Sequence, residues 1–141
     1  MAADPTCIFC KIVAGEVPCL KLFEDAQTLA FMDISPVHDG HCLVIPKVHY
    51  PTVFTISPRA MAAVAQTAAR VAKAVDQAVK PDGLSVMQAN GPGAGQSVAH
   101  FHFHLLPRRM GDQLLFNWER YQTPGDRVRL TELAERIRSF L

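Results

Sequence analysis

The chain has 141 residues, of which 49% are hydrophobic and 19% charged, and its formal net charge is +1. This length suits one domain with a substantial core, so residues 1–141 are expected to form a single domain. The near-neutral charge argues against nucleic acid or a membrane surface as a partner, and any phosphate must be held by a local site. No apolar run approaches the roughly 18–20 residues of a membrane span, and the start lacks a secretory pattern, so we expect a cytoplasmic protein.

Short apolar runs separated by glycine, proline and aspartate predict strands at residues 20–24, 29–33, 42–46, 84–89 and 100–107. After the third strand, Ser57 as N-cap and Pro58 begin a helix whose apolar residues recur every three or four positions up to Val79. A C-terminal helix is expected from Thr131, with glutamates early and arginines late, as the helix dipole favours. An antiparallel sheet with one long helix and one C-terminal helix gives an α+β architecture.

Three of the six histidines alternate strictly with apolar residues. His100, His102 and His104 are separated by Phe101 and Phe103, so a strand would turn the imidazoles to one face and the phenylalanines into the core. One histidine on a strand is usually structural, but three in alternation indicate a chemical role. Two roles remain open from this pattern: zinc chelation by neutral imidazoles, or a nucleophilic histidine that is oriented by its neighbours.

A glycine-rich loop precedes these histidines and favours the second role. Residues 90–97 read Asn-Gly-Pro-Gly-Ala-Gly-Gln-Ser, a composition in which backbone N–H groups can surround an anion. Such a loop alone is weak evidence, because a hairpin turn would look similar. An anion-binding loop that leads into a strand of histidines predicts phosphoryl or nucleotidyl transfer through a histidine nucleophile.

The four cysteines do not indicate a disulfide framework, because the core is large and the expected compartment is reducing. Cys19 and Cys42 lie in apolar runs and are interpreted as buried hydrophobic residues. Cys7 and Cys10 have the Cys-X-X-Cys spacing of a metal half-site or of a redox pair. A redox role is disfavoured, since no helix is expected after them to stabilise a thiolate.

The motif His-Phe-His-Phe-His-Leu-Leu at residues 100–106 resembles the signature of the histidine triad family. The sequence Gly-Gln-Ser-Val at residues 95–98 resembles its nucleoside phosphoramidase branch, and residues 31–36 and 40–46 are similar to the N-terminal half of the family. The resemblance implies a five-stranded antiparallel meander. Two protomers would pair through the long helix and a central strand, expected near residues 84–89, into a dimer-wide sheet. Residues 110–141, with Trp118, would form a C-terminal extension.

The resemblance also implies catalytic roles. His102 would attack the α-phosphorus of a nucleotide and form a nucleotidyl-histidine, which water would hydrolyse to release the nucleoside monophosphate. His104 would contact the phosphate and steady developing charge, and His41 would support the nucleophile. Ser97 would bind phosphate and assist the leaving group.

The other expected site residues bind the nucleotide. The side chains of Gln96 and Ser97 and the backbone amides of Gly95–Ser97 would hold phosphate oxygens, with Asn90 on the phosphate side. Asp33 would accept hydrogen bonds from ribose hydroxyls, although it could instead cap the turn before Ile-Ser-Pro. The apolar slot for the base, whose members could also be ordinary core, would consist of Ile8, Phe9, Ile12, Phe31, Ile34 and Leu43.

The preferred function is a hydrolase or transferase acting on purine nucleoside phosphoramidates or adenylated compounds. One alternative is a dinucleoside polyphosphate hydrolase, which needs the same nucleophile and a different leaving group. The other is a nucleotide-binding adaptor whose catalysis is incidental. The expected partners are a purine nucleotide substrate and a second copy of the chain, and no organic cofactor is expected.

The Cys-X-X-Cys pair is expected to hold a structural zinc ion. Cys7 and Cys10 supply two thiolates from one turn, and His49 and His100 are the best candidates to complete a tetrahedral set. His100 is available because the nucleophile is His102. Some bacterial histidine triad proteins and the related galactose-1-phosphate uridylyltransferases use such a set, and this chain resembles them. The alternative is a pair of free cysteines.

Overall fold

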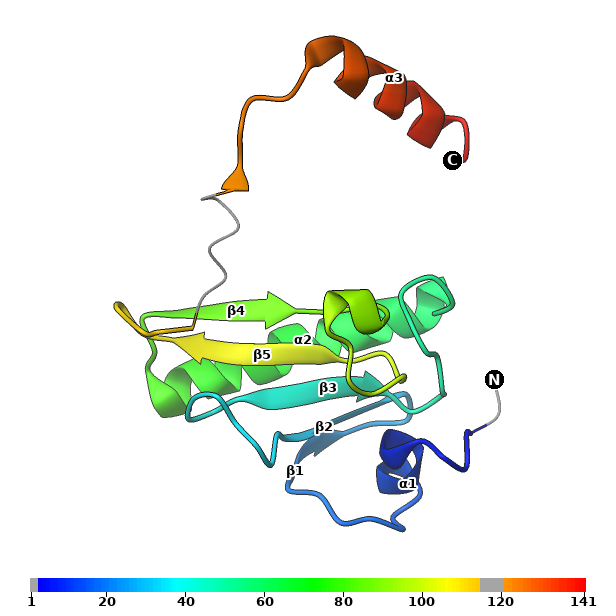
Figure 1. The fold of residues 1–141 in the computed structure, drawn as a ribbon. Helices are drawn as coiled ribbons and strands as arrows, with labels where there is room; N and C mark the ends of the chain where they lie inside the picture. Colours follow the sequence, from blue (N-terminus) through cyan, green and yellow to red (C-terminus); the bar gives the residue numbers. More distant parts are fainter. Residues whose placement is uncertain (1–2, 115–120) are drawn as a thin grey trace.

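A computed structural model describes residues 3–114 and 121–141 of the chain. Five antiparallel strands form one sheet in the order β1-β2-β3-β5-β4, and the long helix α2 lies across one of its faces (Figure 1). The expected α+β fold with a five-stranded antiparallel sheet is therefore confirmed. In chain order the elements are α1 (Ile8–Val13), β1 (Lys21–Glu24), β2 (Thr28–Met32), β3 (Cys42–Pro46), α2 (Pro58–Val79), β4 (Gly83–Met87), the 3-10 helix η1 (Pro92–Ala94), β5 (Phe103–Arg108) and α3 (Arg127–Arg138).

The sheet separates two apolar clusters because successive residues of each strand point to opposite faces. Ala30, Cys42 and Val44 pack on the α2 side, whereas Leu29 and Leu43, with others, pack on the α1 side. Phe101 is fully buried in the α2-side cluster, and Phe103 packs against it. The expected segregation of phenylalanines into the core is thus confirmed, and it leaves the α1 side for the histidines.

Strand positions agree with expectation to within two residues, apart from the start of the last strand. The strand expected from residue 100 begins at Phe103. His100 and His102 precede it, because the Phe101 N–H donates to the Tyr50 carbonyl oxygen, 2.6 Å away, outside the strand ladder. The alternation still holds, because Phe101 packs in the α2-side cluster whereas His102 and His104 line a pocket on the other side of the sheet.

The helix α2 begins and ends where the sequence predicts. The Ser57 hydroxyl accepts a hydrogen bond from the Ala60 N–H at 3.1 Å, and Pro58 occupies the first turn. Lys80 ends the helix in a left-handed conformation with a φ of 51°. Val64, Val71 and Val75 are buried against the sheet.

Two helix expectations are wrong. The C-terminal helix starts at Arg127, since the Asp126 carboxylate caps it by accepting from the Val128 and Arg129 N–H groups, and Thr131 lies inside it. A further helix, α1, directly follows Cys7, which caps it by accepting from the Cys10 N–H at 3.4 Å. The argument against a redox pair from a missing helix therefore fails.

Trp118, part of the expected C-terminal extension, lies outside the described residues. Within residues 3–114 and 121–141, none of the helices is both long and apolar enough to span a membrane.

Candidate active site and metal centre

A pocket of about 310 Å³ opens on the α1 side of the sheet. It brings together most residues that the sequence predicted for the nucleotide site, from α1, β2, the loop after β2, β3 and the segment around the histidine motif. Five further lining residues were not predicted: Val17, Pro18, Cys19, Met32 and Val98. The predicted residues in the lining are Ile8, Phe9, Ile12, Phe31, Asp33, Ile34, Leu43, Ser97, His102 and His104.

The apolar part of this pocket combines core residues with exposed ones. Phe9, Phe31 and Leu43 are buried, and the Phe9 and Phe31 rings meet edge to face with centroids 5.5 Å apart. Ile34 is 87% exposed and Ile8 is 41% exposed, so both lie at the rim. The floor of the pocket is therefore also part of the hydrophobic core. The two interpretations of these residues, as a slot for the base and as ordinary core, are compatible.

The proton position on His102 is fixed by the backbone. Its Nδ1 lies 2.7 Å from the carbonyl oxygen of His100, and because a carbonyl only accepts, Nδ1 carries the proton. Burial lowers the pKa of His102, although the bond to the carbonyl opposes this shift. A neutral ring with its proton on Nδ1 keeps a lone pair on Nε2, the atom a nucleophile needs.

A second chain of hydrogen bonds fixes the protons on His41 and His104. The Val37 N–H donates to His41 Nδ1 at 3.2 Å, so the proton of a neutral His41 sits on Nε2 and is donated to His104 Nδ1 at 2.9 Å. His104 then carries its own proton on Nε2. Burial lowers the pKa of both rings, to about 4 for His104, where the neighbouring His102 and His41 add to the effect.

Asp33 stands beside this chain. Its Oδ2 lies 3.4 Å from His41 Nε2, and its Oδ1 accepts from the Ser35 N–H at 2.8 Å. The turn-capping role considered for Asp33 is thus present, and a ribose contact stays a prediction. Asp33, His41 and His104 lie close enough to hold a metal ion, but His41 could offer Nε2 to a metal only by losing its remaining proton, which favours the hydrogen-bonded chain.

The glycine-rich loop is held in shape by residues expected to bind phosphate. The Gln96 side chain accepts from the Gly91 N–H and donates to the Pro51 carbonyl oxygen, both at 2.7 Å. The Gly95 and Gln96 N–H groups donate to carbonyl oxygens of the same loop. The Asn90 Oδ1 accepts from the Val53 N–H at 2.7 Å. Direct phosphate contacts by these three residues stay predictions.

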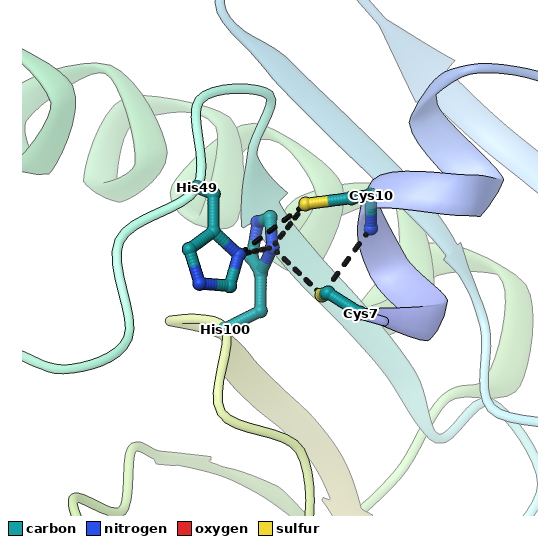
Figure 2. A group of neighbouring side chains, drawn as sticks. All are labelled: Cys7, Cys10, His49 and His100. Carbon is teal, nitrogen blue, oxygen red and sulfur yellow. Dashed lines mark hydrogen bonds between the residues drawn. The ribbon is translucent and has the colours of Figure 1, made fainter. Parts of the chain in front are cut away.

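The four expected metal ligands converge from three segments of the chain (Figure 2). Cys7, Cys10, His49 and His100 are all buried, and their ligand atoms lie within 4.8 Å of one another. The sulfur–nitrogen distances are 3.4 Å for Cys7–His100, 3.3 Å for Cys10–His49 and 3.6 Å for Cys10–His100, and the two Nδ1 atoms are 3.2 Å apart.

These distances fit a tetrahedral zinc ion. Bonds of about 2.3 Å to sulfur and about 2.1 Å to nitrogen would set sulfur and nitrogen about 3.6 Å apart, and two nitrogens about 3.4 Å apart. His100 is also held in the correct tautomer, since its Nε2–H donates to the Pro46 carbonyl oxygen at 2.8 Å and leaves the Nδ1 lone pair toward the cluster. The group can therefore hold a metal ion.

An α+β fold with an antiparallel sheet, in which three alternating histidines follow a glycine-rich loop, defines a histidine triad protein. The HIT domain family model matches residues 14–111, so the chain belongs to this family. It is 39% identical over 135 residues to adenosine 5'-monophosphoramidase hnt1 of Schizosaccharomyces pombe, covering 95% of this chain and 97% of that protein.

Solved structures show the same fold. SMU.412c from Streptococcus mutans superposes with a TM-score of 0.93 at 39% identity, covering 99% of this chain and 88% of that one. A zinc-bound histidine triad family protein from Mycobacterium smegmatis superposes with a TM-score of 0.74 at 36% identity, covering 86% of this chain and 85% of that one.

The lowered pKa of His104 predicts a loss of stability in acid. Between its ordinary pKa of 6.5 and its folded value of about 4, the unfolded chain binds a proton that the folded chain does not, so stability falls as the pH falls. Urea unfolding at pH 7 and pH 5 should show that His104→Gln loses about 1 kcal/mol less than the unmodified protein over this interval. Equal losses in the two proteins would contradict this assignment.

Proposed function

We propose that this protein is a nucleotide hydrolase or transferase that cleaves at the α-phosphate of purine nucleoside phosphoramidates or adenylated compounds. The observation that carries the proposal is His102 in the pocket lining with its proton fixed on Nδ1 by the His100 carbonyl. The 39% identity to an adenosine 5'-monophosphoramidase supports the substrate class.

In the first step the Nε2 lone pair of His102 forms a bond to the α-phosphorus, and the bond from phosphorus to the amine breaks. Positive charge develops on the imidazole, and the carbonyl oxygen of His100 stabilises it through the Nδ1–H. The Nε2–H of His104 donates to a phosphate oxygen, and the Ser97 hydroxyl supplies a proton to the departing amine.

In the second step water attacks the same phosphorus, one of its protons returns to the Ser97 oxygen, and the bond from phosphorus to His102 breaks. The nucleoside monophosphate leaves, and the neutral imidazole is restored with its proton still on Nδ1. His41 and His104 keep their tautomers throughout, because the Val37 N–H holds the far end of the chain.

Replacing His102 by alanine should abolish turnover and leave nucleotide binding largely intact. Losing the atom that forms the covalent bond should lower the rate at least about a thousandfold, whereas losing one contact should weaken AMP binding by no more than about tenfold. Quenching with an alkaline denaturant during turnover of a labelled adenylated amine should trap a nucleotidyl-protein in the unmodified chain only, because a phosphorus–imidazole bond survives in base and is hydrolysed in acid. The control is His38→Ala, which changes a histidine outside the pocket lining.

Comparable turnover by His102→Ala would rule out this nucleophile. Tight AMP binding by the unmodified protein without any trapped intermediate would favour the alternative function, a nucleotide-binding adaptor whose catalysis is incidental.

We also propose that Cys7, Cys10, His49 and His100 bind one structural zinc ion. The tetrahedral distances among their ligand atoms and the zinc-bound Mycobacterium smegmatis relative support this. Four protein ligands leave no position for a reacting water, so the ion ties segments together and takes no part in the chemistry. The thiolates must stay reduced, which suits a cytoplasmic protein.

Protein purified without chelators should contain about one zinc per chain by elemental analysis. Cys7→Ser should lose the metal and melt at a lower temperature, while the His102 intermediate still forms at saturating nucleotide, because the nucleophile is retained. Cys19→Ser makes the same chemical change outside the cluster and should keep its zinc. If the purified protein contained no metal and were fully stable, Cys7 and Cys10 would have to be interpreted as a pair of free cysteines.

Finally, we propose that the chain acts as one histidine triad domain, with residues 110–141 as an extension, and pairs with a second copy through α2 and β4. β4 is an edge strand, and Val86 on it is 51% exposed. Pairing across this edge would satisfy its open backbone groups and join the two sheets.

Sedimentation at micromolar concentration should give about twice the chain mass of 15.5 kDa. Val86→Lys should shift the protein toward monomer, because it places a charge on the pairing edge. Leu20→Lys, near the opposite edge, should not change the mass. A monomeric unmodified chain would contradict the pairing.

A further inference from the structure

The proposed metal ligands belong to three segments. Two of them continue into the lining of the nucleotide pocket, and the third contacts the glycine-rich loop that leads into Ser97 of that lining. Cys7 and Cys10 lie at the start of α1, and the same helix contributes Ile8, Phe9 and Ile12 to the apolar part of the pocket. α1 has six residues, and a helix of this length has little stability of its own. Its position therefore depends on tertiary contacts, which are the packing of Phe9 in the α1-side cluster and whatever holds Cys7 and Cys10 in its first turn.

His49 leads into the segment that supports the glycine-rich loop. Pro51 accepts from the Gln96 side chain, and the Val53 N–H donates to Asn90, each at 2.7 Å. Gln96 in turn accepts from the Gly91 N–H, so the shape of the loop depends on the placement of residues 49–53. The second metal-bound segment thus carries the wall expected to bind phosphate.

His100 contacts both the cysteines of the metal cluster and the proposed nucleophile, His102. Its Nδ1 faces the two cysteines, while its own carbonyl oxygen accepts from His102 Nδ1 at 2.7 Å. The Phe9 ring of α1 packs edge to face against both histidines. Its centroid lies 5.8 Å from that of the His100 ring and 5.2 Å from that of the His102 ring. Moving either α1 or His100 would disturb the orientation of His102.

We infer that the metal ion assembles the nucleotide pocket by fixing α1, the 49–53 segment and His100 relative to one another, so that metal occupancy and nucleotide affinity are coupled. Cys7, Cys10, His49 and His100 then act as positioning residues for the reaction. The inference rests on the proposed nucleotide function and on zinc as the bound metal. It concerns the pocket and the α1-side cluster, to which Cys7 and Cys10 belong, because the α2-side cluster contains none of these four residues.

Coupling between two binding sites is reciprocal, which gives two independent measurements. Titration calorimetry should show that AMP binds the zinc-loaded protein at least about fivefold more tightly than the protein stripped of metal with dipicolinate. Conversely, saturating AMP should raise the affinity of the protein for zinc by the same factor, measured by competition with a chromogenic chelator. Far-ultraviolet circular dichroism should report an intact sheet in the stripped protein. His38→Ala, which changes a histidine outside both the metal cluster and the pocket lining, should show the same coupling as the unmodified chain.

Three outcomes would count against the inference. Equal AMP affinity with and without zinc would show that the ion does not shape the pocket. Loss of the sheet on removing zinc would show that the metal stabilises the whole fold instead. A zinc-loaded protein that binds no AMP would contradict the proposed function itself, which separates that failure from a failure of the coupling.

Discussion

The proposed chemistry of this protein depends on hydrogen bonds between backbone groups and imidazole rings. The His100 carbonyl holds a proton on Nδ1 of His102, the Pro46 carbonyl holds one on Nε2 of His100, and the Val37 N–H keeps Nδ1 of His41 free of one. A neutral imidazole can place its proton on either nitrogen, and only one choice leaves the lone pair where it is needed. Because backbone groups make the choice, each ring receives a defined role in a fold that is otherwise supported by apolar packing.

Burial strengthens the same arrangement. His100, His102 and His41 are all buried, and burial lowers the pKa of each of these rings, so they stay neutral near pH 7. A charged imidazole could neither bind a metal nor attack phosphorus. The free-energy cost of burying these polar rings is offset by apolar packing, because the phenylalanines of the motif lie on the other face of the sheet and complete the α2-side core.

The sequence predicts the parts of this structure that have a period. The strands, the helix α2 and the separation of histidines from phenylalanines follow from alternation or from recurrence every three or four residues. The helix α1 has no such signal, since it is short and its N-cap is the sulfur of Cys7, an atom outside the usual capping set. The sequence predicts the start of α3 too late, because Thr131 and Asp126 are both good N-cap residues and the glutamates after Thr131 favour Thr131, whereas the helix is capped by Asp126.

The candidate site shows a similar division. The Cys-X-X-Cys spacing predicts a half-site, and the choice of His49 and His100 is matched by their distances from the two sulfurs. The sequence could not show that the Gln96 amide bonds to the Gly91 N–H and to the Pro51 carbonyl oxygen, since this depends on where Pro51 lies in space. Nor could it show the Val37 N–H behind His41, because a backbone donor carries no residue signature.

The lining of the pocket has a consequence for product release. Among its described residues it includes the carboxyl group of Asp33 and neither lysine nor arginine. A phosphoramidate ester carries one negative charge, whereas the nucleoside monophosphate formed from it gains a second near pH 6. Neutral imidazoles and N–H dipoles can hold the first charge, but nothing in this lining neutralises the second. In the proposed reaction the product therefore gains a negative charge that no cationic side chain of this lining offsets, and this added charge favours its departure from the pocket.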